Sequence, residues 1–155
     1  MRMTRMLAIA VLLLGAVSII LGGVFLGQAA SKNNLLVMAI EQEKITLGVP
    51  SEEVAAGEII DTAREAEIAG DTVREHRHSI SPTYGELLAG KQFNPTDPQQ
   101  LTYAQALNLE NYLYLAVLGF GLVQVVMASG AFMIVTGLAL GGTGAVLYQL
   151  SGKMD

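Results

Sequence analysis

The sequence predicts an all-α membrane protein: a two-span transmembrane helical hairpin with extended juxtamembrane helices and a small helical or irregular extracytoplasmic cap. The chain of 155 residues is 52% hydrophobic and only 15% charged, and its mean hydropathy is +0.46. Ordinary soluble domains carry about 25% charged residues. Charges are also absent from two long stretches, one between Arg5 and Lys32 and one between Glu110 and Lys153. Each stretch is long enough to cross a bilayer as a helix.

The composition argues against several classes of protein. There is no cysteine, which excludes a disulfide framework, a thiolate nucleophile and a thiolate zinc site. The net charge of −5 argues against nucleic acid as a partner, because phosphate binding depends on clustered Lys and Arg. No nucleophile elbow, phosphate-binding loop or H-E-x-x-H motif occurs. We therefore expect a non-enzyme without a cofactor, whose partners are the lipid bilayer and either itself or another membrane protein subunit.

The first apolar stretch predicts a transmembrane helix over residues 6–30, after a short N-terminal segment of residues 1–5. Twenty helical residues span about 30 Å, the thickness of the hydrocarbon core. A cleaved signal peptide is the alternative, because Arg2 and Arg5 precede the stretch and small residues follow it. We favour a retained anchor, because the apolar region of a signal peptide is typically ~7–15 residues long.

The second apolar stretch predicts a transmembrane helix over residues 113–140, followed by a glycine-weakened tail over residues 141–155. A pair of short spans within residues 113–150 is the alternative. Two spans need ~17–25 residues each and a turn between them, so one span fits this stretch more easily.

The basic residues predict the orientation of the chain. Arg2 and Arg5 precede the first span and Lys153 follows the second. Short basic segments stay inside by the positive-inside rule. We therefore expect a multi-pass protein of the inner or plasma membrane, with both termini cytoplasmic and residues 31–112 extracytoplasmic.

The outer segment is acidic and reads as mostly helical. We expect, in order, a juxtamembrane helix over residues 31–44, a helix over about 51–77, turns over 79–100 and a helix from residue 101. No proline or glycine separates the first of these helices from the first span. Ser51 followed by Glu52 and Glu53 is a typical helix start. Prolines at 95 and 98 break the chain before the last helix.

One group of side chains has the spacing of a metal site. Asp71, Glu75 and His78 lie at i, i+4 and i+7 of a helix, with His76 nearby. Carboxylates and imidazole suit a divalent transition metal. The alternative is a solvated helix end, where Arg77 and the histidines interact favourably with the helix dipole. We favour the solvated end and expect no metal, because the chain has only two histidines and no cysteine.

Small residues recur in both apolar stretches at spacings that place them on one helix face. Such residues let membrane helices approach closely. Gln124 is the strongly polar side chain deep in the second stretch, and in lipid we expect it to face the first span, another copy or a different subunit. The predicted helix-packing residues are Gly15, Ser18, Gly22, Gly23, Gly27, Gln124, Gly130, Gly137 and Gly141.

Four short motifs carry a resemblance to a group of proteins. They are Glu43-Lys44-Ile45-Thr46, the Ala66…Ile68…His76 stretch, Thr83-Tyr84-Gly85-Glu86-Leu87 and residues 116–121. On these motifs, over most of residues 35–140, the chain resembles small bacterial two-span membrane proteins with an extracytoplasmic loop carrying "IT" and "TYAEL"-like motifs. Gly85 stands where the group usually has alanine. The resemblance implies two spans and an outer loop but no activity; some members bear a ring-opening dioxygenase label, and this chain offers no metal triad for that reaction.

Three hypotheses about function follow. The leading one is a non-enzymatic integral membrane protein that serves as an accessory or structural subunit, or as a self-associating scaffold, of a membrane complex. The alternative is an extracytoplasmic ligand- or metal-binding envelope module, anchored by two helices, that senses through residues 51–98. A homo-oligomeric channel fits least, because both spans are continuously apolar and carry no charge.

Overall fold

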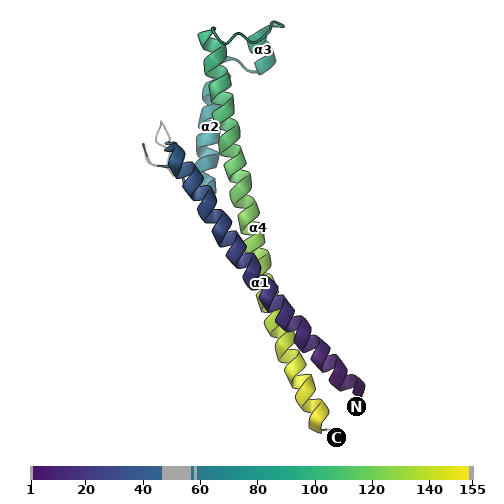
Figure 1. Ribbon diagram of the computed structural model, residues 1–155. Helices are drawn as coiled ribbons and strands as arrows, with labels where there is room; N and C mark the ends of the chain where they lie inside the picture. The colour runs from purple at the N-terminus through teal and green to yellow at the C-terminus, as the bar shows by residue number, and fades with distance from the viewer. Residues whose placement is uncertain (1, 47–56, 58, 154–155) are drawn as a thin grey trace. The chain divides into compact units, whose positions relative to one another are not determined.

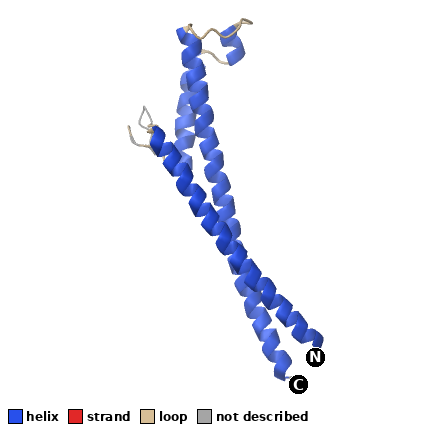
Figure 2. Cartoon of the chain, viewed as in Figure 1, coloured by secondary structure: helices blue, strands red, loops and turns tan. Residues whose placement is uncertain are grey.

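The computed structural model describes residues 2–46, 57 and 59–153. Of these residues 86% are helical and none lies in a strand; Thr46 and Ile59 form an isolated antiparallel bridge. The four helices are α1 (Arg2–Glu43), α2 (Ala63–Ile80), α3 (Tyr84–Leu88) and α4 (Pro98–Lys153), as Figure 1 shows. Loops join α2 to α3 and α3 to α4 (Figure 2). The expectation of an all-α chain is confirmed for the described residues.

The two longest helices are each long and apolar enough to cross a membrane. α1 continues without a break through the expected juxtamembrane segment to Glu43. α4 begins at Pro98, slightly earlier than expected, because Asp97 caps it. The Asp97 carboxylate accepts hydrogen bonds from the backbone N–H groups of Gln99 at 2.9 Å and Gln100 at 3.3 Å. Proline at the first helical position sacrifices no helical hydrogen bond.

α4 also runs through the glycines that we expected to weaken the tail. Gly141, Gly142 and Gly144 all lie inside the helix, which ends at Lys153. Each interior glycine disfavours a helix by about 1 kcal/mol relative to alanine. Interactions outside the helix therefore have to offset this cost.

α2 begins later than expected. The predicted start at Ser51 lies outside the described residues, and residues 59–62, which we expected to be helical, precede the helix. Thr62 is the N-cap: its hydroxyl accepts a hydrogen bond from the Glu65 N–H at 3.2 Å, and the Glu65 carboxylate accepts one from the Thr62 N–H at 3.1 Å. This capping box satisfies two N–H groups that a helix start otherwise leaves unpaired, so it fixes the boundary.

The chain forms two compact units. Unit 1 contains Met1–Asn33 and Leu122–Asp155, which belong mainly to the first part of α1 and the last part of α4. Unit 2 contains Asn34–Gly121, with the rest of these two helices and all of α2 and α3.

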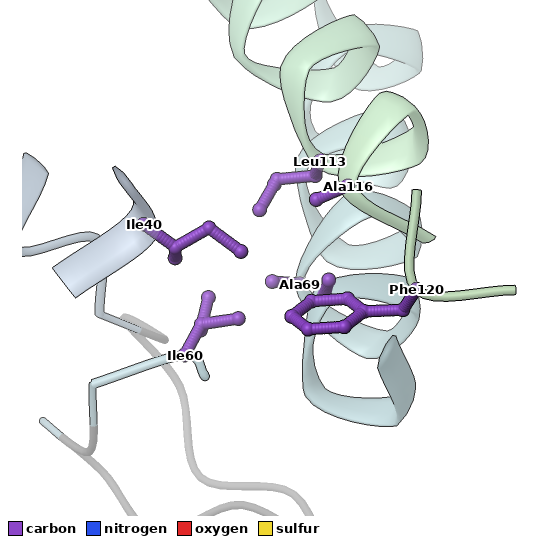
Figure 3. Packing of buried hydrophobic residues seen from close by; sticks show 7 residues of the cluster. Ile40, Ile60, Ala69, Leu113, Ala116 and Phe120 are labelled. Atoms are coloured by element: carbon purple, nitrogen blue, oxygen red, sulfur yellow. The ribbon is translucent and has the colours of Figure 1, made fainter. Parts of the chain in front are cut away.

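Unit 2 has a conventional hydrophobic core made by α1, α2, α4 and the segment that leads into α2. Its buried side chains point toward one another (Figure 3); they are Ile40, Ile60, Ala66, Ala69, Leu113, Ala116 and Phe120. Small residues on α2 let it lie close to α4: a Cβ atom at Gly70 would lie 3.4 Å from the Tyr114 ring. The Ile60 N–H donates to the Ile45 carbonyl at 3.1 Å, which holds the segment before α2 against the end of α1.

Candidate functional site

Small residues line the contact between α1 and α4 within unit 1. They recur every seven residues on each helix and are buried. On α1 they are Ala8, Gly15, Gly22 and Ala29, and on α4 they are Gly130, Gly137, Gly144 and Ser151. A seven-residue step keeps residues on the contact face of two helices that coil gently around each other. We call this set the small-residue seam.

The two helices approach to backbone contact along the seam. A Cβ atom added to Gly22 would lie 2.6 Å from the Gly130 carbonyl oxygen, and one added to Gly137 would lie 2.7 Å from the Gly15 carbonyl oxygen. The later α1 residue is paired with the earlier α4 residue, so the two segments run antiparallel. Any side chain at these positions would collide with the backbone of the opposite helix, so glycine is required.

Two further predicted packing residues contribute to the contact. The Ser18 hydroxyl donates a hydrogen bond to the Met133 carbonyl at 2.7 Å. The Gly141 backbone nitrogen lies 2.7 Å from the position of a Cβ atom at Gly15, although a Cβ atom on Gly141 itself would meet no described atom within 4 Å. Gly141 therefore contacts α1 through its backbone, and a side chain at this position would point away from α1.

Three predicted packing residues lie outside the seam. A Cβ atom at Gly23 or Gly27 would meet no described atom within 4 Å. Gln124 is exposed and has no hydrogen bond to a described residue. Gly23 and Gln124 each follow a buried contact position by one residue, which turns them about 100° away from the opposite helix. Gln124 therefore does not face α1 in unit 1; its contact with another copy or subunit stays a prediction.

An arginine and a tyrosine join the two helices near the chain ends. The Arg5 guanidinium donates to the Tyr148 hydroxyl at 2.8 Å and lies 5.1 Å from the centre of the Tyr148 ring. A guanidinium at this distance from an aromatic face is attracted to it. The seam therefore ends in a polar contact.

Unit 2 contains a buried ion pair that the sequence analysis missed. The Arg77 Nε donates to Glu110 Oε2 at 2.6 Å, and Arg77 Nη2 donates to Glu110 Oε1 at 3.3 Å. The exposed fractions of the two side chains are 10% and 9%. Arg77 also donates to the hydroxyl of the fully buried Tyr103. The hydrogen bond to Glu110 raises the pKa of Arg77 above its ordinary value despite burial.

Our expectation that Arg77 belongs to a solvated helix end is therefore wrong. The signal was in the sequence: Ala66, Gly70 and Val73 follow one another at helical spacing on the side of α2 that faces the core, and Arg77 is the next position of this series. An arginine whose guanidinium is buried on an apolar stripe needs an acidic partner. Glu110 is far away in sequence, so the partner could not be chosen before the fold was known.

The residues considered as metal ligands are not gathered around one point. Asp71 accepts a hydrogen bond from the Tyr114 hydroxyl at 2.6 Å and pairs with Arg74 at 2.8 Å. The other three, Glu75, His76 and His78, are exposed on α2. In the described parts of the chain, no three His, Cys, Asp or Glu residues are placed to hold a metal ion together.

Unit 2 also has an open groove of about 530 Å³ between the end of α1 and the first part of α4. Its walls carry one carboxylate, three neutral amides, one tyrosine and three aliphatic side chains. These residues come from positions 43–45 and 105–115, so no local motif marks the groove in the sequence.

Comparison with protein-family models, with curated proteins and with solved structures found no match.

The small-residue seam predicts opposite effects for two neighbouring glycines. We expect Gly22→Ala to lower the free energy of unfolding in detergent by ~1–3 kcal/mol, because its Cβ atom forces the two backbones apart. Gly23→Ala is the matched control. We expect it to leave stability unchanged or raise it by up to ~1 kcal/mol, because alanine favours the helix and meets nothing. Titration with sodium dodecyl sulfate, followed by far-ultraviolet circular dichroism, measures both. Equal effects of the two substitutions would contradict a glycine-specific contact.

The buried ion pair predicts a large stability loss when one partner is neutralised. We expect Glu110→Gln to lower the free energy of unfolding by ~3–5 kcal/mol, because the Arg77 charge then stays buried without a counterion. Urea unfolding in detergent, followed by tyrosine fluorescence, measures the change.

Glu67→Gln is the control for this experiment. It disrupts the Arg64–Glu67 pair, whose side chains are 60% and 48% exposed, and should cost less than ~1 kcal/mol. A Glu110→Gln effect as small as that of Glu67→Gln would show that burial does not strengthen the Arg77 pair.

Proposed function

We propose that the chain is a non-enzymatic integral membrane protein in which α1 and α4 cross the bilayer as a hairpin. It serves as an accessory or structural subunit, or as a self-associating scaffold, of a membrane complex. One observation carries the membrane assignment: the outside of unit 1 is covered with large apolar side chains. Leu14 is 61% exposed, Ile20 65% and Phe132 72%. Apolar surface of this extent is stable in lipid and unfavourable in water.

The distribution of side-chain size supports the same conclusion. A helix pair in water buries its large apolar residues and exposes polar ones. Unit 1 does the reverse, with glycine and alanine at the contact and large apolar residues outside. Lipid tails are as apolar as leucine, so membrane helices associate through close packing and interhelical hydrogen bonds instead. The seam and the Ser18 hydrogen bond fit this mode.

Contacts in unit 2 support a later position for the second span than residues 113–140. Tyr114 lies against the Asp71–Arg74 pair of α2, and α2 carries exposed charges that need water. The start of the second apolar stretch, up to Gly121, therefore belongs to unit 2. We propose spans over residues 6–30 and 122–148, each long enough to cross the hydrocarbon core.

The proposed orientation places both chain ends in the cytoplasm and unit 2 outside. Arg5 and Lys153 are the basic residues beside the inner ends of the proposed spans, and the positive-inside rule keeps them there. Tyr148 then lies at the inner membrane interface, where tyrosine is enriched.

The role as a subunit or scaffold is supported by Gln124. Its amide is exposed on the apolar outside of unit 1. With the span over residues 122–148, Gln124 lies near its outer end, where its amide can pair with interfacial water or with another membrane helix. A second copy or a different subunit that contacts this face would pair the amide in place of water.

The absence of cysteine from the sequence allows the topology to be tested with single introduced thiols. Ser79→Cys on α2 should react with a membrane-impermeant maleimide in intact cells. Gly152→Cys at the end of α4 should react only after the cells are permeabilised. Both positions are exposed, so burial does not limit either reaction. Labelling of both positions in intact cells would contradict the two-span topology with inside termini.

The same cysteine-free background separates a scaffold from a subunit of a different complex. Ala128 lies one turn beyond Gln124 on the same face, so Ala128→Cys should form disulfide dimers in membranes if copies associate there. Leu122→Cys is the control, because residue 122 is exposed but lies about 160° from Gln124 around the helix. Adding Gln124→Leu should reduce the Ala128→Cys dimer several-fold. Equal dimer yields at 128 and 122 would contradict self-association through the Gln124 face.

A further inference from the structure

The groove in unit 2 lies beside α4, at the end of α1. α1 stops at Glu43, whereas α4 extends past it toward Pro98. Glu43 and Ile45 form one wall of the groove, and α4 forms the other from Gln105 onward. The volume of about 530 Å³ is in the range of small-molecule sites.

The end of α1 beside the groove carries more negative charge than is usual for the C-terminus of a helix. The last carbonyl groups of a helix carry partial negative charge, which basic residues normally balance. The last turn of α1 contains no basic residue and instead carries Glu41 and Glu43. Among the described residues, Glu43 has no ion-pair partner. Both carboxylates are exposed, so this end of α1 keeps its negative charge at little cost in stability.

Lys44, the next residue, forms no ion pair with Glu41 or Glu43. It follows the helix in a left-handed conformation with φ of 49°, and its backbone N–H closes the last turn by donating to the Glu41 carbonyl at 3.1 Å. Its side chain is not part of the groove wall. The negative charge on the wall is therefore available to an external cation.

The other groups on the wall suit an ammonium ion with an aliphatic stem. The amides of Asn108 and Asn111 offer carbonyl oxygens that accept hydrogen bonds. The Tyr112 hydroxyl donates to the Ala39 carbonyl at 3.4 Å, which anchors the ring beside the groove, and an aromatic face attracts cations. Leu109 offers apolar surface to a stem.

The same groups are poor ligands for calcium. Calcium sites take six to eight oxygen ligands, and their affinity depends on the number of carboxylates among them. Glu43 is the single carboxylate of the groove, and the remaining polar ligands are neutral amides and a phenol. An ammonium ion donates up to three hydrogen bonds, and neutral amide and phenol oxygens can accept them.

We propose that this groove binds an organic cation, a primary ammonium group on an aliphatic stem, with Glu43 as its counterion. A free amine and the lysine side chain of another polypeptide share this chemistry. Binding of this cation to unit 2 is independent of the hairpin and of the partner of Gln124.

Isothermal titration of the full chain in nanodiscs tests the proposal with three probes. Cadaverine represents a free amine, a blocked Gly-Lys-Gly peptide represents a lysine side chain, and 1,5-pentanediol is the uncharged analogue of cadaverine. We expect saturable binding of at least one cation and none of the diol. The tighter of the two cations identifies the source. No saturable binding of either cation, or equal binding of the diol, would overturn the proposal.

Two substitutions in the same turn of α1 sharpen the test. Glu43→Gln should raise the Kd for the bound cation at least about tenfold, because it removes the counterion. Glu41→Gln removes the same charge from a residue outside the groove and should change the Kd less than about threefold. Both residues are exposed, so neither change should unfold the chain, and circular dichroism verifies this. Equal losses would show general charge attraction and refute the site.

Discussion

The backbone contact between α1 and α4 is the constraint on which unit 1 depends. At Gly22 and Gly130, and again at Gly15 and Gly137, each helix occupies the space that a side chain would need on the other. The glycines that permit this contact weaken an isolated helix. Close packing along the whole seam offsets that cost, which explains why α4 continues through Gly141, Gly142 and Gly144 instead of ending before them. Because the two backbones touch, no space remains between the helices for large apolar side chains, which therefore lie on the outside of unit 1.

The two units are stabilised by different physical means although they share two helices. Unit 2 has a core of isoleucine, leucine and phenylalanine, as expected where water drives burial. Unit 1 has no comparable large-residue core among its described residues and relies on close backbone approach. Along α4, packing by large apolar residues ends at Phe120, the last residue of this helix in the unit 2 core. One continuous helix thus carries two packing patterns, and each matches the surroundings proposed for its part of the chain.

The sequence predicted the features that depend on one helix at a time. The absence of charge predicted the two long apolar helices, and the regular spacing of small residues pointed to glycines that the structure brings together. Spacing alone could not exclude Gly23 and Gly27, because it does not say which face meets the partner helix. Thr62 and Glu65 have the spacing of the capping box that begins α2, whereas we expect the helix from the similar pattern at the earlier Ser51. The partner of Arg77 and the groove were beyond the sequence, because both depend on where distant segments of the chain meet.

Two glutamates of unit 2, Glu110 and Glu43, lie in contrasting surroundings. Glu110 is buried with a bidentate arginine and a tyrosine beside that arginine, so its charge is satisfied inside the protein. Such a pair does little for stability compared with apolar packing, but it fixes how α2 meets α4, because a displaced partner would leave a buried charge. Glu43 stands at the opposite limit, at a helix end that already carries negative charge and without a counterion in the described chain. Burial forces Glu110 to have a partner, whereas Glu43 is exposed and its charge is solvated by water. A cation from outside the chain can replace that water, and this is the ligand proposed for the groove.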